Sequence, residues 1–209
     1  MQYFSGGWKY WEDDDFANDH VTPYVVRSLF TFRDLGVDIP QASIDSGIAF
    51  IIGLLDNGSS DFEADPDFRA EVFWTLARAK NDRAKILQKV IDPSKLSRHG
   101  YLAYAYGLHY LGQYSDTIDK RLVLLMNAPQ DTDYWYWDKG ADDAIYAQLL
   151  LDLNRTQDAS IVLDNLLRDT DLSSYYVSTQ EKIQLFLALV KHTSLTAVKS
   201  VSQIAVRAQ

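Results

Sequence analysis

The feature that most constrains this chain is a recurrence of helical segments that are rich in small residues. Such segments span about residues 100–107, 141–151 and 184–189, so they return roughly every 40 residues. Between them lie stretches in which apolar residues repeat with helical spacing. Helix pairs of this period either stack into an open array or close into a ring. We therefore predict an all-α fold, an α/α toroid of paired antiparallel helices.

Cap and turn residues set the predicted helix boundaries. Asp65 before Pro66 predicts an N-cap followed by a proline at the first helical position. Gly36 and Gly112 are placed to end helices, and Ser178 with Glu181 three residues later forms a capping-box pattern. The predicted helices cover about residues 22–35, 41–57, 66–76, 82–90, 92–111, 116–126, 142–153, 157–167, 178–190 and 195–206.

The number of predicted helices bears on the domain organisation. A complete toroid of paired helices contains about twelve helices, and the sequence predicts roughly ten. We therefore expect an incomplete ring, formed by a single domain over residues 1–209 that is a fragment of a larger multidomain protein. An incomplete ring exposes apolar edges, which favour association, so we also expect a homodimer.

Charge and residue content exclude several classes of function. The chain of 209 residues carries a formal net charge of −9, which disfavours a nucleic-acid partner or an anionic membrane surface. Its longest apolar run, residues 48–55, is too short for membrane insertion, and its start is not a signal peptide. There is no cysteine, and none of the four histidines has a partner at metal-ligand spacing. We therefore assign no catalytic residue, no cofactor and no metal site.

Aromatic residues concentrate in loops ahead of three predicted helices. In a toroid such loops would cap one end of the ring. The alternation of Trp135 and Trp137 puts both rings on one side, which suits either a ligand platform or the core, and we favour the core. The three clusters are Trp8, Tyr10 and Trp11; residues 134–137; and Tyr175 with Tyr176.

An acidic run follows the first aromatic cluster. Asp13, Asp14 and Asp15 lie close to Trp8 and Trp11, a combination that helical-toroid glycosidases use to grip and cleave sugars. No second acid can be placed opposite them, so we favour a solvated loop whose charges suit the following helix N-terminus. A Mg²⁺ or Ca²⁺ loop is also disfavoured, because required ligands are missing. These residues are therefore candidates for a surface or ligand-binding loop only.

Three segments, in this order and at this spacing, form a recognisable set. Together they resemble the thioester-containing domain of the α2-macroglobulin and complement family, in its bacterial branch. The match covers nearly the whole chain. The segments are residues 6–11 (GGWKYW) with 21–25 (VTPYV), residues 100–105 (GYLAYA), and residues 178–181 (STQE) with 185–189 (LFLAL).

The resemblance implies a fold and a role. The family domain is an α/α toroid within a large periplasmic or extracellular protein that traps proteases. In thioester-bearing members a Cys-x-Glu-Gln motif captures nucleophiles covalently, and it lies upstream of the segment that matches Gly6. The present chain has no cysteine, so that bond cannot form here. We expect either a truncated domain or a parent protein that has lost the thioester.

The sequence therefore favours a non-enzymatic domain of a bacterial α2-macroglobulin-like protein. Its expected partners are proteases and the neighbouring domains of the parent protein. Two alternatives stay open at this point. One is a toroidal carbohydrate-active enzyme that uses the acids at positions 13–15. The other is a helical-repeat scaffold that binds proteins through a concave polar face.

Overall fold

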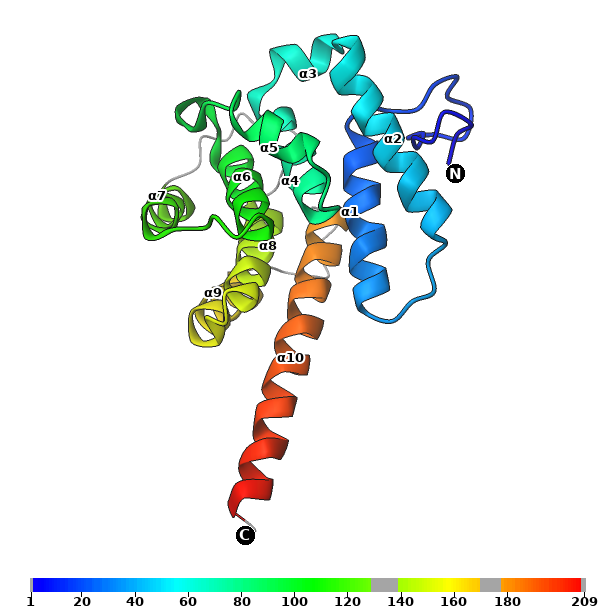
Figure 1. The fold of residues 1–209 in the computed structure, drawn as a ribbon. Helices are drawn as coiled ribbons and strands as arrows, with labels where there is room; N and C mark the ends of the chain where they lie inside the picture. The colour runs from blue at the N-terminus through cyan, green and yellow to red at the C-terminus, as the bar shows by residue number, and fades with distance from the viewer. Residues whose placement is uncertain (1, 129–138, 170–177, 208–209) are drawn as a thin grey trace. The chain divides into compact units, whose positions relative to one another are not determined.

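The regular structure of the chain is helical. The computed structural model describes residues 2–128, 139–169 and 178–207, and outside its helices these residues form one isolated bridge, between Gln2 and Trp8. The all-α prediction is confirmed. The chain divides into two units, Met1–Leu125 and Met126–Gln209, and the boundary falls near the end of α7. The single domain expected over residues 1–209 stays a prediction. The helices labelled in Figure 1 are α1 Val21–Asp34, α2 Gln41–Asn57, α3 Ser60–Ala64, α4 Pro66–Arg78, α5 Arg83–Gln88, α6 Arg98–Tyr110, α7 Asp116–Asn127, α8 Lys139–Asp152, α9 Thr156–Asp169 and α10 Thr179–Arg207.

In the first unit, α1 and α4 are parallel neighbours. Arg27, in the middle of α1, contacts Glu71 in the first half of α4. Further along both helices, Asp34 at the end of α1 pairs with Arg78 at the end of α4 at 2.8 Å. Contacts that advance in the same direction on both helices require parallel axes.

Helices α4 and α6 are parallel as well. Near their starts, Asp67 accepts a hydrogen bond from the backbone N–H of Ser97, the residue before α6. Later in both helices, the rings of Trp74 and Tyr106 stack at 4.5 Å. Parallel neighbours need a returning segment between them, and α2 and α5 provide it. This alternation is the arrangement expected of stacked helix pairs.

Helices α4 and α6 form the interior of the first unit. Residues 70–77 of α4 and 99–108 of α6 are buried on every face. A helix that is buried on every face is mostly apolar, and small residues let it approach its neighbours closely. Gly107 illustrates this, because a Cβ atom there would overlap the ring of Phe73. The small-residue segment predicted at residues 100–107 is therefore an interior helix.

The second unit repeats the pattern with three helices. Near the starts of α8 and α10, the side chain of Glu181 lies against Gly140, and at the later end Lys191 pairs with Asp152. These two helices are therefore parallel, and α9 returns between them. Their shared core contains the buried residues Ala144, Ala147, Leu163, Leu166, Leu185 and Ala188.

The prediction of one continuous helix over residues 92–111 was wrong. Asp92 accepts hydrogen bonds from the N–H and the hydroxyl of Ser94 and holds a short 3₁₀ turn at Pro93–Lys95. Leu96 is then extended, and α6 begins anew after Ser97, whose hydroxyl oxygen accepts from the N–H of Gly100 at 3.2 Å. The local side-chain caps therefore divide the segment.

Other boundaries also differ from expectation. The two helices predicted at residues 178–190 and 195–206 are one continuous helix, α10, because no glycine or proline interrupts them. The short helix α3 was not predicted. The caps at Asp65 and Ser178 are confirmed, since each side chain accepts a backbone N–H of the following first turn.

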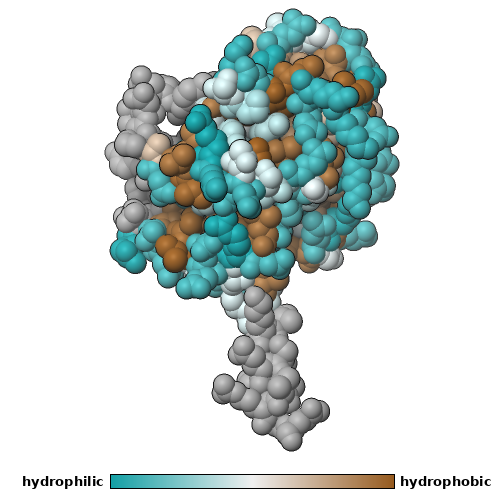
Figure 2. All heavy atoms as spheres, turned by 60° about the vertical axis from the view of Figure 1, so that its left-hand side comes forward, coloured by the Kyte–Doolittle hydropathy of each residue, from teal (hydrophilic) through white to brown (hydrophobic). Residues whose placement is uncertain are grey.

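Large hydrophobic side chains also lie on outer surfaces. On the face drawn in Figure 2, hydrophobic residues form separate areas among hydrophilic ones. Exposed examples from different helices are Ile86, Leu124, Ile161 and Phe186.

Candidate functional site

The segment that carries the predicted aromatic and acidic residues is a closed loop. We call residues 8–18 the aromatic loop. The N–H of Asn18 donates to the carbonyl oxygen of Trp8 at 2.7 Å and so joins the two ends. The side-chain oxygen of Asn18 accepts from the N–H of Val21 and connects the loop to the start of α1. A compact loop whose ends meet in this way is an Ω-loop, a type that frequently serves function.

Trp8 anchors the aromatic loop. The Trp8 ring lies over Gly47 of α2, where a Cβ atom would overlap the ring. The backbone N–H of Trp8 donates to the hydroxyl of Thr22 at 2.9 Å. Gly7 also lies close to an aromatic ring, because a Cβ atom there would be 3.0 Å from the ring of Phe50. In Figure 1 this segment is the dark blue trace beside α2. Trp8 therefore holds the loop in place, and its ring is only partly accessible.

The other aromatic side chains of the loop point into solvent. Tyr10 is 63% exposed and Trp11 is 69% exposed, and their rings meet edge to face at 5.0 Å. Phe16 is 79% exposed. The structure therefore brings Tyr10 and Trp11 together as a surface pair.

The predicted acids lie on the same loop. Asp14 accepts a hydrogen bond from the backbone N–H of Trp11 at 2.8 Å and shapes the turn between them, whereas Asp13 and Asp15 are exposed. Within the described residues, no group of three His, Cys, Asp or Glu side chains could hold a metal ion. Trp135 and Trp137 lie outside the described residues.

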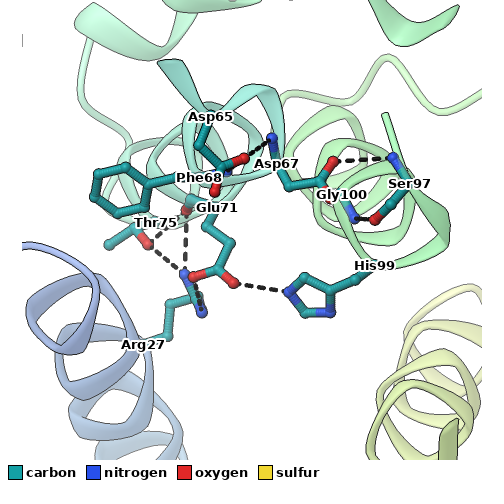
Figure 3. A network of polar contacts seen from close by, with 9 residues as sticks. All are labelled: Arg27, Asp65, Asp67, Phe68, Glu71, Thr75, Ser97, His99 and Gly100. Carbon is teal, nitrogen blue, oxygen red and sulfur yellow. Dashed lines mark hydrogen bonds and ion pairs between the residues drawn. The ribbon is translucent and has the colours of Figure 1, made fainter. Parts of the chain in front are cut away.

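A buried ion network joins the three parallel helices of the first unit (Figure 3). The guanidinium of Arg27 lies 3.2 Å from one carboxylate oxygen of Glu71, and the other oxygen lies 2.7 Å from Nε2 of His99. Arg27 also donates to the hydroxyl of Thr75 at 2.9 Å. Each of α1, α4 and α6 thus contributes one charged or titratable side chain, and Glu71 is central.

The charges of this network stabilise one another. Burial alone would raise the pKa of Glu71, but the Arg27 charge and the His99 hydrogen bond outweigh it and lower the pKa to about 2. Burial lowers the pKa of Arg27, and the Glu71 carboxylate opposes that change. An ionised carboxylate only accepts hydrogen bonds, so Nε2 of His99 carries the proton between them.

Aromatic rings complete the surroundings of Arg27. Its guanidinium lies 4.4 Å from the ring centre of Trp74, a cation–π contact in a desolvated site. Trp74 also stacks on the ring of Tyr106, with planes inclined by 14°. The network is therefore enclosed by apolar surface, which strengthens its electrostatic interactions.

Sequence reasoning missed this network. His99 was considered only as one of four histidines that lack a partner at metal-ligand spacing. A usable signal was present, because Glu71 stands alone in an apolar helical run between Ala70 and Val72. A lone acid in such a run predicts a buried partner of opposite charge.

Two further carboxylates occupy equivalent places in the two units. Asp67 of α4 lies against Gly100 in the first turn of α6, and Glu181 of α10 lies against Gly140 in the first turn of α8. Burial raises the pKa of Asp67, although hydrogen bonds from Ser97 oppose the increase. In both places an acid of one helix lies beside the N-terminus of its parallel neighbour, where glycine leaves room for it.

Comparison with solved structures assigns this arrangement to a class. The fold is that of an all-α domain of bacterial α2-macroglobulins, so the predicted toroid class is confirmed. Salmonella α2-macroglobulin reacted with methylamine is similar over 91% of this chain, with a TM-score of 0.70 and 21% identity. Native Escherichia coli α2-macroglobulin, from domain MG7 to the C-terminus, is similar over 92% of this chain, with a TM-score of 0.69 and 21% identity.

The similarity covers a small part of those proteins. The chain spans 13% of the Salmonella protein and 32% of the Escherichia coli fragment. No protein-family model and no curated protein matches the chain. Among the described residues, no helix is both long and apolar enough to cross a membrane. The comparisons therefore establish the fold.

Proposed function

We propose that this chain is a non-catalytic helical domain of a bacterial α2-macroglobulin-like protein that traps proteases. The observation that carries the proposal is the fold match over 91–92% of the chain. The three sequence segments that resemble the same family support it independently. Because the chain has no cysteine, it contributes to trapping without a thioester of its own.

The proposal includes a location and partners. The parent protein acts in the periplasm or outside the cell, and its partners are proteases and its own neighbouring domains. Association of this chain into a homodimer is also part of the proposal. Sedimentation velocity at several concentrations tests it, and a single species of 23.8 kDa at all of them would contradict it.

The first experiment is an immunoblot of fractionated source cells with antiserum raised against this chain. We expect a band far larger than 23.8 kDa in the periplasmic or secreted fraction. A band near 23.8 kDa in the cytoplasm would contradict the proposal and favour a small helical scaffold.

Trapping itself is tested on the purified parent protein. A trapped protease keeps its active site but is screened from large substrates. After incubation with the parent protein, we expect a protease to cleave a small peptide substrate at its normal rate and to lose activity on a large protein substrate. Equal loss on both substrates would indicate active-site inhibition, and no loss on either would reject trapping.

A further inference from the structure

Exposed aromatic side chains are concentrated in the aromatic loop. Tyr10, Trp11 and Phe16 project from a segment of eleven residues, 8–18, and expose 63%, 69% and 79% of their surface. Phe4, just ahead of the loop, exposes 89%. Contiguous exposed apolar surface marks interaction sites, and aromatic residues are enriched in protein interfaces.

The loop holds these rings in place. The hydrogen bond between Asn18 and Trp8 closes its ends. Across the tip, the N–H of Asp14 donates to the carbonyl oxygen of Trp11 at 3.3 Å, and the Asp14 carboxylate accepts the N–H of Trp11 at 2.8 Å. A surface that is ordered before its partner arrives loses less conformational entropy on binding.

The charge of the loop indicates the chemistry of the partner. Residues 8–18 contain one lysine and four consecutive acids. Nζ of Lys9 lies 4.6 Å from the ring centre of Tyr3 and donates to the backbone carbonyl oxygen of Glu12 at 3.5 Å, so its hydrogen bond in this run goes to the backbone. Within the part of the chain that the structure describes, the exposed carboxylates of Asp13 and Asp15 form no hydrogen bond or ion pair. They are therefore available to a ligand.

Carboxylates and aromatic faces both attract cations. An arginine or lysine side chain can pair with a carboxylate and lie over a neighbouring ring. A neutral sugar would use the rings but gain little from the acids. We propose that the aromatic loop is a docking surface for a protein segment rich in arginine or lysine, with Trp11 and Tyr10 as the rings and Asp13 and Asp15 as the charges. This inference goes beyond protease trapping and does not depend on it.

The test measures binding of a fluorescein-labelled peptide of alternating arginine and glycine to the 209-residue chain, by fluorescence anisotropy. In the variant Asp13→Asn/Asp15→Asn we expect affinity to fall by about tenfold. The control variant Asp38→Asn/Asp164→Asn changes the net charge equally at exposed sites elsewhere, and it should change affinity by less than about twofold.

A second pair of variants tests the rings. Trp11→Ala should weaken binding about fivefold, because the cation–π contacts are lost. Phe186→Ala removes a ring that is 63% exposed on α10 and should leave the affinity unchanged. All four substituted acids and both rings are surface residues, so circular dichroism should show the same helical content in every variant.

Three results would overturn the proposal. The first is an equal loss of affinity in the loop and control variants, which would show attraction by net charge alone. The second is equal binding of a peptide with glutamine in place of arginine, or competition by neutral oligosaccharides, which would indicate a sugar site. The third is absence of peptide binding at low salt. None of these results bears on the periplasmic parent protein or on trapping.

Discussion

At the scale of single residues, the first unit depends on Glu71. Its carboxylate balances the buried guanidinium of Arg27 and accepts a hydrogen bond from Nε2 of His99. Replacing buried ion pairs by apolar side chains is often tolerated, but removing one partner leaves an uncompensated charge. Loss of one member of the network should therefore destabilise the fold, whatever the net contribution of the intact network to stability.

We predict that Glu71→Gln lowers the free energy of unfolding by about 3–5 kcal/mol, because Arg27 is then buried without its counter-charge. Urea unfolding followed by circular dichroism measures the change. Asp158→Asn is the control, since it breaks a partly exposed pair with Arg155 and should change stability by less than about 1 kcal/mol. Similar effects of the two substitutions would contradict the role of the network.

The same carboxylate predicts a dependence of stability on pH. Folding lowers the pKa of Glu71 from 4.5 to about 2. The stabilisation is therefore complete above pH 4.5 and is lost as the pH falls towards 2, with a total of about 3 kcal/mol. Urea midpoints measured between pH 6 and pH 2.5 should fall in the native chain. The decline should be shallower in Glu71→Gln, and parallel declines would count against this assignment.

At the scale of helices, close packing of parallel neighbours depends on glycine. In an ordinary exposed helix, alanine in place of glycine stabilises by about 0.5–1 kcal/mol. At Gly107 of α6 the added methyl group would overlap the buried ring of Phe73. At this position alanine in place of glycine should therefore destabilise the chain.

We predict that Gly107→Ala destabilises the chain by about 1–3 kcal/mol, the usual range for an overpacked core. Gly53→Ala in α2 is the control, because the nearest atom to its new Cβ is 4.0 Å away, and it should stabilise slightly. Thermal unfolding of the two variants gives the comparison. A stabilised Gly107→Ala would show that α4 and α6 are packed less closely than described.

The sequence allowed most helices to be predicted but few of their contacts. Asp65 and Ser178 act on their own first turns, so their caps were visible in local sequence. The division between Pro93 and Ser97 was missed because two caps follow each other within six residues of a helical pattern. The partners of Glu71 lie 44 and 28 residues away, and only the parallel arrangement of three helices brings them together. The exposed rings of the aromatic loop were recognised as a group, but their orientation depends on the anchor at Trp8.

At the scale of the whole molecule, the absence of cysteine predicts how this chain responds to methylamine. The Salmonella relative has been obtained after reaction with methylamine. We predict that this chain keeps its mass of 23.8 kDa after the same treatment, because it cannot form a thioester. Intact mass spectrometry before and after incubation gives the answer. A mass increase equal to one methylamine adduct would contradict the prediction.

The parallel course of α1, α4 and α6 also has an electrostatic consequence. Each helix carries a partial positive charge at its N-terminus, and in an alternating bundle these charges would cancel between neighbours. Here the three macrodipoles point the same way, so the partial positive charges of these three helices lie at one end. At that end, the carboxylate of Asp67 lies against Gly100 in the first turn of α6. This carboxylate therefore offsets part of the positive end of the α6 dipole.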